Sequence, residues 1–301
     1  MRVFVTGASG HIGSAVVPEL LGAGHEVTGL ARSEASAAAL AAAGAKVQRG
    51  DLDDLATVRD AAAASDGVIH LAFKHDAMFS GDVAGALEAN RLAIETIGDA
   101  VAGSGKPFLI ASGTLMLAFA GLDHTGTEAD ALETGLRVDA ENYVVALAER
   151  GVRSSVLRLP PTVHSALDHH GFIPAMIGFA RAKGVSPYVG DGSNRWPAGH
   201  TLDVAHLYRL ALESAPSGSR LHAVGDEGIP FREIAEAIGR QLNLPVTSIP
   251  AEEAEAHFGY LAAFVQLDNP TSSAWTRQLL DWQPTHPGLI EDLAEGHYFS
   301  G

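Results

Sequence analysis

The sequence contains no cysteine, no long apolar run and comparatively few basic residues. Without cysteine the protein has neither disulfides nor thiolate chemistry, which fits a reducing cytoplasm. No apolar run reaches about 18 residues and the N-terminus enters a strand directly, so we expect neither membrane insertion nor export. Lysine and arginine number 20 against 36 aspartates and glutamates, and the formal net charge of −16 repels nucleic acid phosphates. We therefore expect a cytoplasmic protein that binds neither nucleic acid nor membranes.

The hydrophobic residues and the histidines are abundant, and their pattern indicates a large folded core without a metal centre. The chain has 301 residues, of which 47% are hydrophobic, enough to fill one or two lobes. Its 14 histidines are scattered along the sequence. The adjacent His169 and His170 have the wrong spacing for one helix face, and no His-Glu-x-x-His occurs. We expect no metal site.

The most informative stretch lies at the N-terminus, where a strand expected at residues 2–6 leads into Gly7-Ala-Ser-Gly-His-Ile-Gly13. A helix to about residue 21 and a strand at 26–30 complete a β-α-β unit. Gly7 permits a tight turn, Gly10 lets a diphosphate approach backbone amides, and Gly13 lets the helix pack on the strand. The anion then lies at a helix N-terminus, which favours negative charge. We expect a dinucleotide site here; a purely structural turn is the alternative.

The end of the second strand bears on which dinucleotide is bound. An NAD site usually has an acidic residue there for the ribose hydroxyls, whereas an NADP site has a small residue beside a cation. This chain has Ala31 followed by Arg32, whose guanidinium can bind a 2′-phosphate with two hydrogen bonds. The pattern favours NADP, with a surface arginine of no cofactor role as the alternative.

Strands and helices alternate through the first half of the chain. Further strands are expected at 45–50, 67–72, 107–111 and 154–159, and further helices at 33–43, 55–64, 84–102 and 133–150. This alternation indicates a Rossmann-type α/β fold, a doubly wound parallel sheet with helices on both faces. Ligands of such sheets bind beyond the carboxyl ends of the strands, so the residues just after each strand are the functional candidates.

Several segments together carry a resemblance to a known family. They are Thr6-Gly-Ala-Ser-Gly-His-Ile-Gly13, Asp51-Leu52, His70-Leu71-Ala72, Asn90, Ala111-Ser112-Gly113-Thr114, Arg158-Leu-Pro-Pro-Thr-Val-His164, Leu202-Asp-Val-Ala205 and Leu280-Asp-Trp-Gln-Pro284. Over nearly its whole length the chain resembles the extended short-chain dehydrogenase/reductase superfamily, grouped with NAD-dependent epimerases and dehydratases. The resemblance implies that Asp51 binds the adenine amino group and that Leu52 flanks the ring. It also implies that Ala72 lies beside the cofactor and that residues 161–163 border the nicotinamide.

The resemblance further implies two domains. Residues 1–164 and 197–227 would form the dinucleotide-binding domain, and residues 165–196 and 228–301 a smaller C-terminal substrate lobe. A homodimer through the helices at 84–102 and 133–150 is expected from the resemblance alone. The expected cofactor-binding residues are Gly7, Ser9, Gly10, His11, Ile12, Gly13, Arg32, Asp51, Leu52, Leu71, Ala72, Arg137, Pro161 and Val163.

The chain departs from the family at its catalytic pair. The family uses a Tyr-x-x-x-Lys near the start of a helix, where the lysine lowers the phenol pKa and the tyrosine moves a proton. Here Tyr143 is followed four positions later by Leu147 and lies late in its helix. Aligning the helix by the segment from Arg137 to Glu141 places Arg137 at the lysine position and Glu133 at the tyrosine position. We therefore expect the usual pair to be absent, as in atypical members.

Four residues remain as the main catalytic candidates, and His164 is an additional one. Ser112 and Thr114 can hydrogen-bond a carbonyl oxygen, with the register open by one or two residues. Arg137 can hold ribose hydroxyls but does not donate a proton at neutral pH. Glu133 can shuttle protons if burial raises its pKa, or it is a solvated residue favoured by the helix dipole. His164 is either a further acid near neutral pH or a satisfied core residue.

The substrate is expected between the two lobes, in contact with His164, Phe172, Arg195 and Trp196. Arg195 meets an anionic substrate or instead stacks on Trp196. The sequence thus predicts an NADP-preferring oxidoreductase, with NAD as the alternative cofactor, that acts on a small carbonyl compound or alcohol. A redox sensor or scaffold that binds the dinucleotide without turnover is the second interpretation. A nucleotide-sugar epimerase or dehydratase is the third, because it needs the missing base.

Overall fold

A parallel sheet forms the centre of the computed structural model, which describes residues 1–300. Its seven strands within that range are, in sheet order, β10 (Ser219–His222), β6 (Arg153–Leu159), β5 (Pro107–Gly113), β4 (Gly67–His70), β1 (Arg2–Thr6), β2 (Glu26–Ala31) and β3 (Lys46–Arg49). The chain order reverses between β1 and β4, which makes this the point where a Rossmann-type sheet binds its ligand. The doubly wound parallel sheet expected from the sequence is confirmed.

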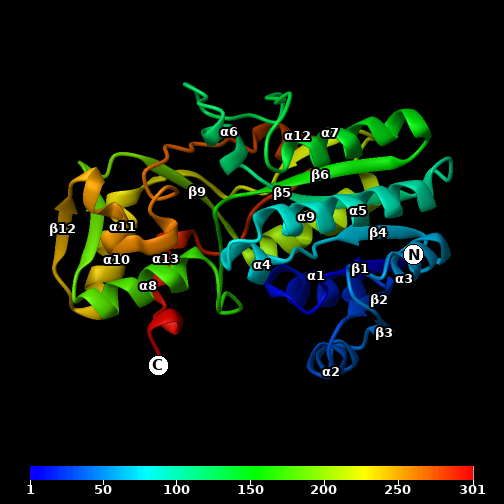
Figure 1. Ribbon diagram of the computed structural model, residues 1–301, viewed down its shortest axis with the longest axis horizontal. Coiled ribbons are helices and arrows are strands. Elements are labelled where there is room, and N and C mark those ends of the chain that lie inside the picture. The colour runs from blue at the N-terminus through cyan, green and yellow to red at the C-terminus, as the bar shows by residue number, and fades with distance from the viewer. Residues whose placement is uncertain (301) are drawn as a thin grey trace.

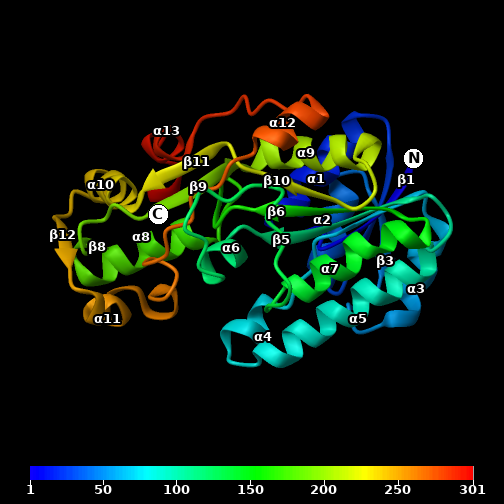
Figure 2. The same cartoon turned by 90° about the horizontal axis from the view of Figure 1, so that it is seen from above.

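Helices cover both faces of this sheet (Figures 1 and 2). One face carries α1 (His11–Gly22), α2 (Glu34–Ala42) and α9 (Thr201–Ser214); the other carries α3 (Leu55–Ala64), α5 (Val83–Val101) and α7 (Val138–Ala146), which continues as η1 (Leu147–Arg150). Successive side chains of a strand point to opposite faces, so Val3 and Val5 pack under α1 while Phe4 packs under α3 and α5. The short helices α4 (His75–Phe79) and α6 (Leu115–Phe119) follow β4 and β5.

One helix boundary differs from the sequence-based expectation. The helix expected at 133–150 begins at Val138. Gly135 has φ +156, a backbone angle that no helix contains, so the preceding residues form a loop. Across residues 1–300 no helix has the length and apolar character needed to cross a lipid bilayer.

A second lobe extends from the carboxyl edge of the main sheet (Figure 1). The strands that lead into it are β7 (Thr162–His164), β9 (Arg195–His200) and β11 (Asp226–Pro230), and a further pair is β8 (Ser186–Val189) and β12 (Val246–Ile249). Its helices are α8 (Phe172–Lys183), α10 (Phe231–Leu242), η2 (Ala251–Glu253), α11 (Ala254–Phe258), η3 (Gly259–Leu261), α13 (Leu289–Ala294) and η4 (His297–Phe299). These elements enclose their own apolar core, whereas α12 (Ala274–Leu280) returns to the main sheet.

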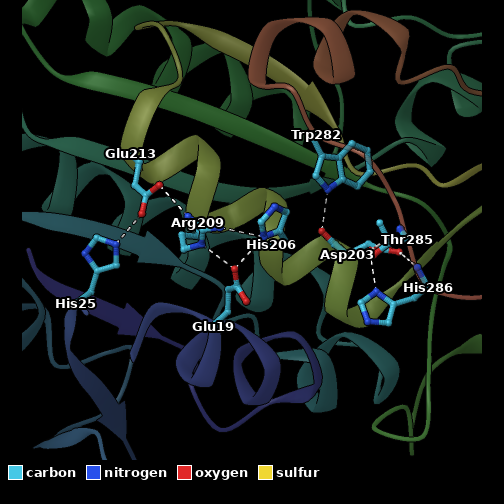
Figure 3. A network of polar contacts seen from close by, with 9 residues as sticks. All are labelled: Glu19, His25, Asp203, His206, Arg209, Glu213, Trp282, Thr285 and His286. Carbon is cyan, nitrogen blue, oxygen red and sulfur yellow. Dashed lines mark hydrogen bonds and ion pairs between the residues drawn. The ribbon is translucent and has the colours of Figure 1, made fainter. Parts of the chain in front are cut away.

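Polar contacts fix α9 to α1 and to the C-terminal segment (Figure 3). Arg209 Nε on α9 donates to Glu19 Oε1 on α1 at 2.7 Å. At the start of α9, Asp203 Oδ1 accepts a hydrogen bond from the amide of Thr285 at 3.0 Å, and its backbone carbonyl accepts one from Trp282 Nε1, also at 3.0 Å. The helix α9 is therefore held by α1 on one side and by the C-terminal segment at its start.

Candidate functional site

The turn between β1 and α1 is shaped to receive a phosphate. Gly7 has φ +66, a left-handed conformation, and a Cβ there would lie 2.6 Å from the amide nitrogen of Ala72. A Cβ on Gly13 would lie 2.2 Å from the carbonyl oxygen of Gly7. Gly10 is the N-cap of α1, and no side chain of the described residues caps this helix end. The first amides of α1 are therefore left for a ligand, and the helix end favours an anion.

Hydrogen bonds hold the ends of β1 and β4 against this turn. Thr6 Oγ1 lies 2.9 Å from His70 Nδ1 and accepts a hydrogen bond from the amide of Ala72 at 3.2 Å. The amide of Leu71 donates to the carbonyl of Thr6 at 3.1 Å. On the other side of the imidazole, His70 Nε2 lies 3.2 Å from Asn90 Oδ1 on α5. Leu71 and Ala72, two of the expected cofactor neighbours, are thereby fixed beside the turn.

The buried His70 leads to a prediction about pH and stability. Burial lowers the pKa of His70 from 6.5 to about 4. The imidazole of the unfolded chain binds a proton as the pH falls through about 6.5, whereas the folded one does not. The free energy of unfolding is therefore expected to fall between about pH 6.5 and 4, by up to about 3 kcal/mol for this group. Urea unfolding across this range measures it.

The control for this prediction is His70→Gln, which keeps a polar side chain but removes the titrating group. The stability difference between wild type and variant should shrink as the pH falls, because only the wild type loses this contribution. A difference that stays constant from neutral pH to about pH 4 would contradict the assignment.

Two arginines flank the end of β2, where the adenine ribose of a dinucleotide is expected. Ala31 is buried, and the following Arg32 is exposed, with Nη2 3.4 Å from Asp76 Oδ2. Arg49 lies opposite Ala31 on β3, and its Nη1 donates to the carbonyl of Ser33 at 3.0 Å. Sequence reasoning identified Arg32 but missed Arg49, because only the pairing of β2 with β3 brings it there.

The other residues assigned to the cofactor lie at the same edge of the sheet. Asp51 and Leu52 follow β3, and Pro161 follows β6. Leu52 is buried, while Asp51 Oδ1 accepts a hydrogen bond from the amide of Asp53 at 3.1 Å. Val163 is buried on β7. In the glycine-rich turn, the expected neighbours Ser9 and Ile12 are exposed and half-buried respectively.

The end of β5 gathers the polar groups expected to meet a substrate oxygen. Ser112 is 3% exposed, and its Oγ has no hydrogen-bond partner within residues 1–300. Thr114 Oγ1 accepts a hydrogen bond from Asn269 Nδ2 at 2.9 Å. Arg137 Nη2 donates to the carbonyl of Ala111 at 2.8 Å. A buried hydroxyl without a partner is costly, so Ser112 marks a position where a ligand oxygen is expected.

Arg137 is a cation without a counter-ion. Its guanidinium stacks over the ring of Phe73, 4.7 Å from the centroid. No carboxylate oxygen lies within 4.0 Å of it in the part of the chain that the structure describes. Burial lowers the pKa of Arg137, but a guanidinium remains charged at neutral pH. A charge placed in this way attracts an anion or an oxygen that gains negative charge.

Neither Glu133 nor Tyr143 takes the place of the family's tyrosine. Glu133 is exposed in the loop before α7, so the expectation that it starts the helix is wrong, and the interpretation of a solvated residue fits better. Tyr143 lies between α5 and α7, where its hydroxyl donates to the carbonyl of Glu95 at 3.4 Å and accepts from Arg150 Nη1 at 3.3 Å. It belongs to the outer helical layer rather than to the sheet edge.

His11 connects the glycine-rich turn to α9, and His164 connects β7 to α13 of the second lobe. His11 Nε2 lies 2.8 Å from Thr201 Oγ1 at the start of α9, and burial lowers the pKa of His11 to about 4. His164 is 0% exposed, with Nδ1 2.9 Å from Asp292 Oδ2 on α13. The Nδ1 atom of His164 thus joins β7 to α13, while its buried Nε2 has no hydrogen-bond partner within residues 1–300, so the expected contact with a substrate stays a prediction.

The remaining residues expected to meet the substrate differ in their surroundings. Trp196 is 0% exposed in the core of the second lobe, where it packs between Phe172 and Phe231. Arg195 donates two hydrogen bonds to Asp268, at 3.0 and 2.7 Å. In this structure the Trp196 ring therefore packs in the core of the lobe and the exposed Arg195 pairs with Asp268, and contact of either residue with a substrate stays a prediction. Phe172 is only half-buried and stays a candidate.

The chain is similar to other proteins along its whole length. The model of the NAD dependent epimerase/dehydratase family matches residues 3–224. An uncharacterized protein of Schizosaccharomyces pombe is 48% identical over 301 residues, which cover 99% of this chain and 100% of that protein. An uncharacterized protein of Saccharomyces cerevisiae is 45% identical over 298 residues, which cover 97% of this chain and 98% of that protein.

Other similar proteins have named activities. A Stigmatella aurantiaca protein named 4-hydroxy-2-methyl-3-oxo-4-farnesyl-3,4-dihydroquinoline-1-oxide ketoreductase is 27% identical, over 86% of this chain and 80% of its own. The dTDP-glucose 4,6-dehydratase DesIV of Streptomyces venezuelae, with NAD and TYD bound, has a TM-score of 0.78 at 20% identity, covering 99% of this chain and 96% of its own. The Thermus thermophilus UDP-glucose 4-epimerase complex with NAD has a TM-score of 0.71 at 21% identity, covering 100% of both chains. At these identities the solved structures show the fold alone.

Proposed function

Because the chain belongs to the NAD dependent epimerase/dehydratase family, we propose that it is an NADP-preferring oxidoreductase acting on a small carbonyl compound or alcohol. The observation that carries this proposal lies at the end of β5, where an unpartnered Ser112 hydroxyl and the Arg137 guanidinium are both held. These groups stand at the sheet edge where the glycine-rich turn leaves its amides free. The ketoreductase among the similar proteins supports carbonyl reduction.

Each group at this edge has a separate role in the proposed reaction. A nicotinamide dinucleotide bound at the turn would supply or accept the hydride. The amides at the start of α1 would hold its diphosphate. Ser112 would donate a hydrogen bond to the substrate oxygen and fix the position of the carbonyl carbon. Arg137 would stabilise the negative charge that this oxygen gains, and it acts by charge alone because a guanidinium does not release its proton at neutral pH.

Loss of the Ser112 hydroxyl tests the proposed reaction. Ser112→Ala is expected to lower kcat/KM about 10–100-fold, because a hydrogen bond to a charged oxygen contributes about 1.5–3 kcal/mol. The measurement is steady-state oxidation of NADPH with a panel of aldehydes and ketones. Ser155→Ala is the matched control, since Ser155 also has a buried Oγ without a partner in residues 1–300 but lies inside β6. Equal activity of the two variants would refute the role of Ser112.

The preference for NADP is tested at Arg32. Arg32→Ala is expected to raise the Kd for NADPH about tenfold and to leave the Kd for NADH unchanged, because the guanidinium would contact only the 2′-phosphate. Isothermal titration calorimetry measures both constants. Arg59→Ala, which changes an exposed arginine on α3, is the control. Equal affinity of the wild type for NADPH and NADH would overturn the NADP preference.

The missing catalytic pair favours a second candidate function, a redox sensor or scaffold that binds the dinucleotide without turnover. Leu147 stands four positions after Tyr143, where the family has lysine, and Tyr143 itself is engaged between α5 and α7. NADPH binding without reduction of any substrate in the panel would favour this function. The activities named for the epimerase and dehydratase structures come third, because they need a base that this chain lacks at the tyrosine position.

A further inference from the structure

An exposed aromatic ring stands just beyond the end of β5. Phe119 ends α6 and is 48% exposed, although it is a large apolar side chain. Because α6 begins directly after Thr114, its five residues carry the chain only about 7.5 Å further. The backbone of Phe119 therefore stays near the end of β5.

The second lobe adds two rings to form what we call the aromatic wall, namely Phe119, Phe172 and Phe264. The centroid of the Phe264 ring lies 5.7 Å from that of Phe119 and 5.4 Å from that of Phe172. Phe172 and Phe264 are half-buried, so each keeps part of its surface accessible. Residues from both lobes thus share one apolar surface.

One segment of the second lobe fixes both the aromatic wall and the polar groups of β5. Asn269 follows Phe264 by five positions, is 3% exposed, and donates to Thr114 Oγ1 at 2.9 Å. The next residue, Pro270, accepts a hydrogen bond from the amide of Gly126 at 2.8 Å. The segment cannot leave β5 without breaking these bonds. This segment therefore connects the aromatic wall to the end of β5, the strand that carries Ser112.

Arg137 at the end of β5 is assigned above to the substrate oxygen, so it is not left to bind a separate anionic group of a ligand at the aromatic wall. Arg195, the cation beside this segment, is neutralised by two hydrogen bonds to Asp268. The chain as a whole has a formal net charge of −16. A nucleoside diphosphate needs cations for its phosphates, whereas an uncharged ring gains stacking and edge contacts from phenylalanine.

We propose that the aromatic wall binds the ring of an uncharged aromatic aldehyde or ketone. This inference rests on the oxidoreductase function proposed above and names its substrate class. In the reaction, the hydride of NADPH adds to the carbonyl carbon, the π electron pair moves to the oxygen, and the oxygen takes a proton from water. NADPH is oxidised to NADP⁺, and the carbonyl compound is reduced to the alcohol.

Benzaldehyde and propanal are the probes that test the substrate class. The wild type is expected to show a kcat/KM about tenfold higher for benzaldehyde, and Phe119→Ala should remove this preference while leaving propanal within about twofold. Tyr260→Ala is the control, because Tyr260 is a 49% exposed aromatic residue of the second lobe whose ring packs on Phe179. Equal kcat/KM for the two aldehydes in the wild type would overturn the proposal. An equal decrease of kcat/KM for benzaldehyde in Phe119→Ala and Tyr260→Ala would overturn it as well.

A binding measurement separates this proposal from the proposed function. Benzamide, which is not reduced by hydride transfer here, is added to the protein with NADP⁺ and observed by saturation-transfer NMR. Suppose that the wild type binds benzamide, that Phe119→Ala does not, and that no aldehyde is reduced. This outcome would refute the oxidoreductase function and support ring binding at the aromatic wall. Reduction of both aldehydes with an unchanged benzamide signal in Phe119→Ala would refute the wall alone. If Phe119→Ala sediments differently from the wild type but still binds benzamide, the proposal is also refuted. Phe119 would then serve association between copies of the chain.

Discussion

Replacing Glu141 with alanine is expected to lower the free energy of unfolding by about 3–5 kcal/mol. The side chains of Glu141 and Arg158 are each 1% exposed. The guanidinium donates from Nε and Nη2 to both carboxylate oxygens, at distances of 2.8, 3.1 and 3.2 Å. Removing the carboxylate leaves a buried cation that water does not reach. Urea unfolding should therefore show a lower midpoint with an unchanged m-value.

Two further variants make this prediction specific. Arg91→Ala breaks hydrogen bonds to Glu88 and Glu95 on the exposed side of α5, and it should leave the urea midpoint nearly unchanged because water screens these charges. The double variant Glu141→Leu with Arg158→Leu removes both buried charges and should recover part of the loss. If Glu141→Ala lowers the free energy of unfolding as little as Arg91→Ala does, the stabilising role of the buried ion pair is contradicted.

The same ion pair positions the candidate site. Glu141 lies in the first turn of α7, the helix that Arg137 precedes as N-cap. Arg158 Nη1 also donates to the carbonyl of Asp130, at 2.9 Å, in the loop that leads to this helix. The buried pair thus fixes where α7 begins, and with it the guanidinium of Arg137 at the end of β5.

The parts of the site that the sequence predicted are set by local geometry. The turn from Gly7 to Gly13 is one strand, one turn and one helix start, and the close approach at Gly7 and Gly13 follows from their missing Cβ atoms. The parallel sheet follows from the alternation of strands and helices, since a right-handed crossover places each new strand beside an earlier one. Neighbouring residues carry this information, so a single sequence suffices.

The parts that the sequence missed depend on distant pairings. Asn269 reaches Thr114 across 155 positions, and Arg49 reaches the end of β2 only because two strands pair. No periodicity encodes such contacts. Trp196 depends on tertiary packing in another way: the sequence places it beside a substrate between the lobes, whereas β9 carries its ring into the lobe core.

Arg137→Ala is expected to lower kcat about 10²–10³-fold on the best substrate of the panel, because it removes the charge that would stabilise the developing oxyanion. Arg137 is suited to this task by its surroundings: it has no carboxylate within 4.0 Å among the described residues, so its charge is free to act on a ligand. The Kd for NADPH should change less than about tenfold, since other groups would hold the dinucleotide. Steady-state kinetics and calorimetry give the two quantities separately.

Comparing the change in kcat with the change in the Kd for NADPH distinguishes two roles for this arginine. A cation that only binds ribose hydroxyls would weaken NADPH binding and leave kcat nearly intact, whereas one that stabilises the oxyanion does the reverse. Arg137→Lys keeps the charge but loses the planar fork, so it should restore part of kcat. Arg150→Ala, which removes an exposed partner of Asp99 at the far end of the same helix, should change neither quantity. Unchanged kcat in Arg137→Ala together with a raised Kd for NADPH would refute the oxyanion role and leave Arg137 as a residue that binds the ribose hydroxyls.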